Sequence, residues 1–168
     1  MPELPDPPSA PPHASDERTL LTTFLDYQRQ VMLRKVIGVS DEDLRRPMTE
    51  SNVTLLGIVK HLGYVERDWF QDVFLGQDVE TPWTDEDRDA DWRIEPGEET
   101  DVIVAFYRDE IAKANEITAA SDLDAVAARP EAGGVTMRWI LVHMIEETAR
   151  HLGHADLIRE RIDGVVGD

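Results

Sequence analysis

The amino-acid sequence predicts an all-α protein, a four-helix bundle with a long acidic loop between its second and third helices. Four long segments place apolar residues at helical spacing. No segment shows the sustained apolar–polar alternation of a half-buried strand, and polar connections separate the four segments, as in helix bundles. The 168 residues and the 41% apolar content fit one domain with a sizeable core.

Residues 1–14 are predicted to form a flexible proline-rich tail ahead of a single metal-binding domain at residues 15–168. Six of the ten prolines fall within the first twelve residues, a composition typical of extended chain. The tail has neither the basic start nor the apolar run of a signal peptide. No stretch approaches the roughly 18 apolar residues that a membrane span needs. We therefore expect a cytoplasmic protein.

The first helix is predicted over residues 16–39. Ser15 is expected to be its N-cap, and Asp16 and Glu17 place negative charge in its first turn. Ser40 then opens a Ser-x-x-acid capping box, which predicts one or two further turns of helix before the next proline.

The other three helices follow the same apolar spacing. The second is predicted over residues 54–75 and ends at Gly76. The third is predicted over residues 100–120. The fourth covers residues 136–162 and closes at Gly164.

The connection between the second and third helices is unusually long and acidic. Residues 77–101 contain eleven acidic residues and two arginines, which accounts for half of the net charge of −18. Loops of this length are commonly functional or disordered. Trp83, Trp92 and Ile94 suit a loop that is anchored on the bundle. The sequence leaves open whether the loop is only anchored or forms a lid over one end of the bundle.

Charge and composition exclude several classes of function. A net charge of −18 argues against binding nucleic acid or an anionic membrane surface. The absence of cysteine excludes disulfides, a thiolate nucleophile and every cysteine-based metal site. Motifs of zinc proteases, phosphate-binding loops, hydrolase elbows and dinucleotide sites are also missing. Any metal must therefore bind to His, Asp or Glu.

The fourth predicted helix carries a candidate metal pair. His143, Glu147 and His151 follow one another at intervals of four residues, which places neighbours on one face. A carboxylate and an imidazole at this spacing converge above the helix, as metal ligands do. Because all three together span about 12 Å, only two adjacent members can bind one ion. An inward-facing carboxylate is costly unless it is paired or coordinated.

His61, in the middle of the second helix, is the candidate third ligand. It lies one turn after Gly57, where a partner helix is expected to approach closely. His154 could line a pocket beside the site. Each candidate also has a structural interpretation without a metal. His61 can be a hydrogen-bonded core histidine, and Glu147 with His151 can be a hydrogen-bonded surface pair that stabilises the helix by only a few tenths of a kcal/mol. On spacing alone, both interpretations stay open.

Two segments resemble a known family. Residues 54–62, TLLGIVKHL, look like the second-helix signature of the DinB-like superfamily, and residues 147–156, ETARHLGHAD, look like its fourth-helix signature. The chain is more narrowly similar to the actinobacterial mini-circle protein branch. In the superfamily, a histidine of the second helix and a pair spaced by four on the fourth helix bind a divalent metal. The resemblance therefore implies His61, Glu147 and His151 as the metal ligands, and not His143.

The Glu-x-x-x-His form of the pair resembles the mycothiol-dependent maleylpyruvate isomerases, whose N-terminal domain binds zinc through a His, Glu, His set. Those isomerases have a further C-terminal domain that contributes to the substrate site, so their isomerase activity is not implied here.

The resemblance implies a divalent-metal-dependent enzyme. The expected cofactor is zinc, with nickel or manganese as alternatives. Three protein ligands leave an open position where a bound thiol or water becomes a stronger acid. The expected activity is transfer of a low-molecular-weight thiol of the mycothiol type to a small-molecule electrophile, or hydrolysis by the activated water. The 14 arginines against 3 lysines suggest a GC-rich genome, in keeping with a mycothiol user.

Other interpretations remain. The same fold can serve as a non-enzymatic binding module in which loop 77–101 is an acidic partner surface, and the charge alone also allows a nucleic-acid mimic. A homodimer is expected from the resemblance. Glu66, Asp68 and Glu146 are candidates to orient the ligand histidines through hydrogen bonds.

Overall fold

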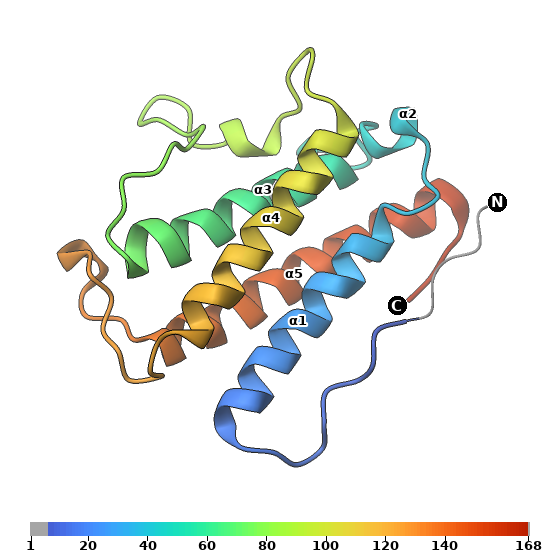
Figure 1. Cartoon of the computed structure of the whole chain (residues 1–168). Coiled ribbons are helices and arrows are strands. Elements are labelled where there is room, and N and C mark those ends of the chain that lie inside the picture. The colour runs from blue at the N-terminus through green and yellow to red at the C-terminus, as the bar shows by residue number, and fades with distance from the viewer. Residues whose placement is uncertain (1–6, 168) are drawn as a thin grey trace.

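The computed structural model describes residues 7–167, and within them it confirms the all-α bundle: it contains five α-helices and no strand. Figure 1 shows the four long helices and the short α2. Residues 7–14 of the predicted tail have no helix, whereas residues 1–6 and 168 lie outside the described part of the chain. The α-helices are α1 (Glu17–Lys35), α2 (Asp41–Leu44), α3 (Leu55–Arg67), α4 (Thr100–Ala119) and α5 (Met137–Asp163). Three shorter helical segments are η1 (Asp68–Phe74), η2 (Ala90–Trp92) and η3 (Pro130–Ala132).

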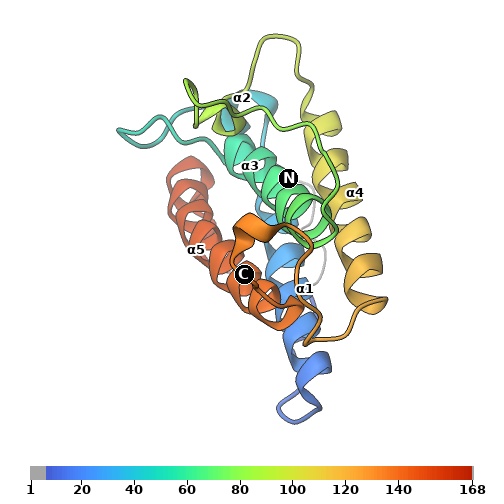
Figure 2. The ribbon, with the colours of Figure 1, turned by 90° about the vertical axis from the view of Figure 1, so that its left-hand side faces the viewer.

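The helices pack through two contacting pairs, α3 with α4 and α1 with α5. Helix α3 also contacts α5, and Figure 2 shows it lying between α4 and α5. Two clusters of buried apolar side chains fill the interior, one toward α2 and one toward η1. Between them, Arg29 of α1 forms a buried two-pronged ion pair with Glu66 of α3, at 2.7 and 2.6 Å.

The helix starts follow local capping chemistry. The expectation of Ser15 as the first N-cap is wrong: the side chain of Asp16 accepts the hydrogen bond from the backbone N–H of Thr19, since a carboxylate is an equally good cap one residue later. Ser40 caps α2 as predicted. Thr54 caps α3 through the N–H of Gly57.

The predicted second helix is divided between two helical types. After Arg67 the α-helical pattern of α3 gives way to the π-helix η1, which ends at Phe74. Both Phe70 and Phe74 remain buried. Phe70 and Phe74 are four residues apart, a spacing that an α-helix would also place on the core, so the apolar pattern does not reveal the change of helical type.

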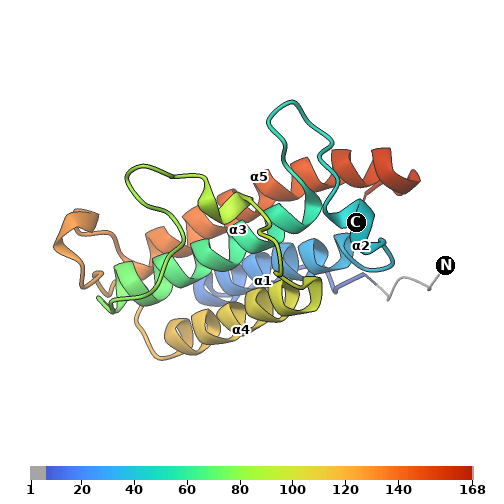
Figure 3. The ribbon, with the colours of Figure 1, turned by 90° about the horizontal axis from the view of Figure 1, so that it is seen from above.

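The long connection between η1 and α4 lies along α3 (Figures 1 and 3). Gly57 makes this approach feasible, because a Cβ at that position would lie 2.4 Å from the carbonyl oxygen of Trp92. Lys60 holds the next part of the loop: its Nζ donates to the Arg93 carbonyl at 2.7 Å and pairs with Glu98 at 2.8 Å.

Aromatic residues add two further contacts of the loop with α3. Trp83 meets Tyr64 edge-on, with ring centroids 5.9 Å apart, and Trp92 stacks on His61. Both tryptophans thus act as the anchors that the sequence suggested, and η2 brings the second one to the edge of the candidate site.

Candidate metal centre

Three side chains predicted as ligands come together between α3 and α5. The ligand atoms of His61, Glu147 and His151 all lie within 4.8 Å of one another, and no other such group is found among residues 7–167. Oε1 of Glu147 lies 3.0 Å from Nε2 of His151 and 3.5 Å from Nε2 of His61. Around a tetrahedral zinc ion with bonds of 2.0–2.1 Å, ligand atoms lie about 3.3 Å apart. The donor types fit a divalent ion, and the two distances from Glu147 lie on either side of this value.

Local helix geometry explains this convergence. Glu147 and His151 are one turn apart on α5, and both side chains are largely buried against α3. His61 faces them from the middle of α3, with its ring meeting the His151 ring edge-on at 4.8 Å. Helices α3 and α5 therefore bring two imidazoles and one carboxylate to the same place between them.

The protonation states favour metal binding. Burial raises the pKa of Glu147, but the hydrogen bonds and charges of His151 and His61 outweigh this effect, so its pKa lies below the usual value. Burial, together with the neighbouring His61, lowers the pKa of His151. The carboxylate is therefore ionised and the His151 imidazole is neutral at neutral pH, which are the forms that bind a metal.

A loop carboxylate orients His61. Oδ2 of Asp91, in η2, lies 2.6 Å from Nδ1 of His61, and Asp91 is almost completely buried. This hydrogen bond assigns the proton to Nδ1 and leaves the lone pair of Nε2 facing Glu147. The arrangement is the carboxylate–histidine support typical of metal sites.

The sequence reasoning did not select Asp91. One acid among eleven in the loop carries no periodic signal, and only its place beside Trp92 could have indicated it. Within the described part of the chain, none of the three candidates proposed for this role forms a hydrogen bond or ion pair with a ligand histidine: Glu66 pairs with Arg29, Glu146 pairs with Arg150, and Asp68 lies in η1.

Aromatic side chains border the centre. The indole of Trp92 stacks on His61, with ring centroids 3.9 Å apart, and its centroid is 5.0 Å from that of His151. His154 lies one turn further along α5, 5.5 Å from the His151 ring.

His143 belongs to a different cluster. Its ring stacks on Trp139 with centroids 5.2 Å apart and contacts Trp69 at 4.6 Å. The structure thus brings His61, Glu147 and His151 together without His143.

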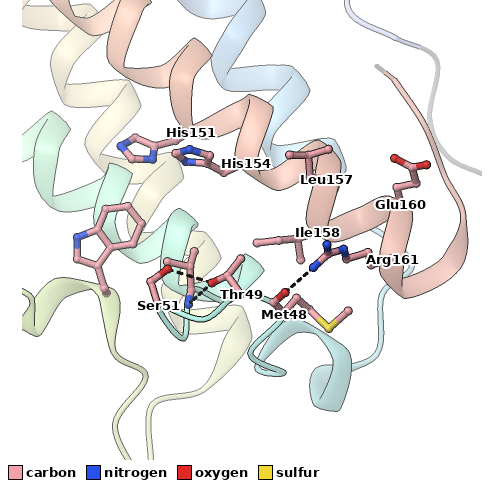
Figure 4. A pocket seen from close by; sticks show the side chains of 11 residues that line it. Met48, Thr49, Ser51, His151, His154, Leu157, Ile158, Glu160 and Arg161 are labelled. Atoms are coloured by element: carbon pink, nitrogen blue, oxygen red, sulfur yellow. Dashed lines mark hydrogen bonds between the residues drawn. The ribbon is translucent and has the colours of Figure 1, made fainter.

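A cavity of about 740 Å³ opens beside the centre (Figure 4). His151 and Trp92 belong both to the centre and to the cavity wall. One side of the cavity is a row of α5 residues, with His151 and His154 at the end near the centre and Arg161 at the far end. The full lining consists of Met48, Thr49, Ser51, Val53, Trp92, His151, His154, Leu157, Ile158, Glu160 and Arg161.

Comparison with known proteins gives a family. The family model described as mycothiol-S-transferase matches residues 20–164, a span that contains every residue of the centre and of the cavity. No curated protein matches the chain. No helix among residues 7–167 is both long enough and apolar enough to cross a membrane.

Proposed function

Because the chain belongs to the mycothiol-S-transferase family, which is part of the DinB-like superfamily, we propose that it is a divalent-metal-dependent enzyme that transfers a mycothiol-type thiol to a small electrophile. His61, Glu147 and His151 are the proposed ligands, and zinc is the proposed ion. The observation that carries this proposal is the convergence of two imidazoles and one carboxylate at metal-binding spacing beside a large cavity.

Each residue has a distinct part in the proposed reaction. Bound zinc would supply Lewis acidity, lowering the pKa of a thiol in its open position. Asp91 holds the Nδ1–H of His61 and so keeps Nε2 directed at the centre. Burial keeps His151 neutral, and Trp92 shields one side of the centre from solvent.

The overall transformation is a substitution at carbon. A bond forms between the thiol sulfur and the electrophilic carbon, while the bond from that carbon to its leaving group breaks. The leaving group takes the bonding electron pair: a halide departs and the thiol proton passes to solvent, whereas the oxygen of an epoxide stays attached to the product and takes up a proton. The acidic surface suits a neutral thiol such as mycothiol better than an anionic one, since a net charge of −18 repels anions.

A non-enzymatic binding module receives less support. Several acids of the loop are engaged within the chain, with Asp87 paired to Arg93, Glu98 to Lys60 and Asp91 to His61. The first pair lies within the loop, and the other two hold the loop on α3. A cavity at the ligand set is what a small-molecule enzyme requires.

The test begins with the metal content of tag-free protein, compared with His151→Ala. We expect about one ion per chain in the wild type and a large loss in the variant, because one of three ligands is removed. Zinc-loaded wild type should then consume mycothiol in the presence of an aryl halide or an epoxide. Val142→Gln, a change at an exposed position of the same helix, is the matched control and should retain metal and turnover.

Two results would refute different parts of this proposal. A wild type that takes up no added zinc, nickel or manganese would refute the metal centre. A wild type that holds zinc but fails to consume mycothiol with any electrophile would refute the transferase.

A further inference from the structure

The cavity beside the centre has a chemical character that restricts its ligand. Its α5 wall runs from His151 to Arg161, a separation of ten residues or about 15 Å of helix. A small molecule in contact with the ligand set therefore lies against the near part of the wall and does not reach Arg161.

The near part of the cavity is largely apolar. Trp92 and Val53 line it together with Leu157 and Ile158 of α5. Leu157 is 63% exposed, so its side chain contributes little to the core and is available to a ligand. The close view shows Leu157 and Ile158 following His154 along the helix (Figure 4).

The polar groups of the opposite wall are mostly engaged with one another. The hydroxyls of Thr49 and Ser51 are 3.1 Å apart, and Thr49 also accepts from the backbone N–H of Val53. Arg161 donates to the backbone carbonyl of Met48 at 2.9 Å. The hydroxyl groups of this wall are therefore used within it, whereas Nδ1 of His151, at the end near the centre, has no hydrogen-bond partner in the described chain.

The charges of the wall do not favour an anion either. Glu160 lies next to Arg161 in the sequence and lines the same cavity. The chain as a whole carries a net charge of −18. A neutral, apolar ligand matches the apolar near part of the cavity and avoids the repulsion.

We propose that this cavity is the electrophile subsite and that it selects neutral, apolar electrophiles such as aryl halides. That the ligand is the electrophile of the reaction rests on the proposed function, whereas the preference for an apolar ligand does not. In the reaction the thiol sulfur bonds to the ring carbon, the halide leaves with the bonding pair, and the thiol proton passes to solvent. Leu157 and Trp92 are the residues that would contact the ring.

Binding can be tested without turnover. The probe is N-phenyl-1-naphthylamine, a neutral dye whose emission rises in apolar surroundings, titrated into the full chain. We expect saturable binding that 1-chloro-2,4-dinitrobenzene displaces. Leu157→Gln should weaken dye binding about five- to tenfold, because an amide replaces the apolar contact. Val142→Gln removes a comparably exposed apolar side chain from the same helix but outside the cavity, and it should bind the dye like wild type.

The outcomes separate this inference from the proposed function. Dye binding lost in Leu157→Gln supports the subsite even where no thiol is consumed, and that combination would refute only the transferase. Absent dye binding, equal binding by Leu157→Gln, or weakening only in Val142→Gln would overturn the subsite. A kinetic preference for 4-chloro-3-nitrobenzoate over its neutral analogue would overturn the neutral selectivity.

Discussion

Replacing Asp91 by Asn should weaken metal binding while the fold is preserved. The variant keeps the shape of the side chain but removes the charge from the 2.6 Å hydrogen bond to Nδ1 of His61. A hydrogen bond to a charged group contributes about 1.5–3 kcal/mol, and a neutral one about 0.5–1.5 kcal/mol. The difference of about 1–2 kcal/mol corresponds to a zinc dissociation constant about five- to thirtyfold higher. Both groups are largely buried, so solvent screens this interaction little.

The assay is competition for zinc against a coloured chelator of known affinity, at fixed ionic strength. Asp85→Asn is the matched control, since it removes one charge from an exposed position of the same loop. A long-range effect of net charge would move both variants equally, whereas orientation of His61 moves only Asp91→Asn. Equal zinc affinities for wild type and Asp91→Asn would refute the positioning role.

Three further predictions concern the scaffold. Gly57→Ala should displace the loop from α3 and weaken zinc binding in the same competition assay, because its Cβ would collide with a loop carbonyl. Gly153→Ala is the control: its Cβ would meet no atom within 4 Å, and alanine favours the helix, so the free energy of unfolding should rise by up to about 1 kcal/mol. Glu66→Leu should lower the free energy of unfolding, measured in urea, by about 3–5 kcal/mol, because it leaves Arg29 buried without its main partner. Adding Arg29→Met should recover most of that loss. A double variant as unstable as the single one would contradict this account. Burial, with a smaller effect of the neighbouring Asp72, raises the pKa of Asp68 to about 6. The cost of ionising it is therefore absent below its ordinary pKa, grows as the pH rises from that value toward 6, and is complete above 6. Asp68→Asn should stabilise the protein at pH 7–8 by roughly 1 kcal/mol, after allowance for partial exposure, and have no effect near pH 3; equal effects at both pH values would refute the shifted pKa.

Periodicity and capping were sufficient to predict the helices. The apolar stripes required four long helices, and the starts of α2, α3 and α5 follow from Ser40, Thr54 and Thr136. The error at the start of α1 arose because two adjacent residues, Ser15 and Asp16, are both good caps.

The candidate site was predictable only in part. Glu147 and His151 lie on one helix, so their convergence follows from a spacing of four residues, and His61 could be added through the family resemblance. Asp91 reaches the centre through tertiary packing of an irregular segment against Gly57 and Lys60, and no local pattern encodes such a contact. The π-helix η1 was not predictable either, because Phe70 and Phe74 are buried at a spacing that an α-helix would also use.

The loop contact also has a consequence for folding. The centre and its support come from three segments of the chain, α3, η2 and α5, separated by roughly thirty and sixty residues, so they are not assembled in the unfolded chain. An ion that binds only the folded state shifts the unfolding equilibrium, by about 2.7 kcal/mol when free metal is at one hundred times its dissociation constant. The thermal midpoint would then report zinc availability, and a cell starved of zinc would contain a larger fraction of unfolded chains open to proteolysis.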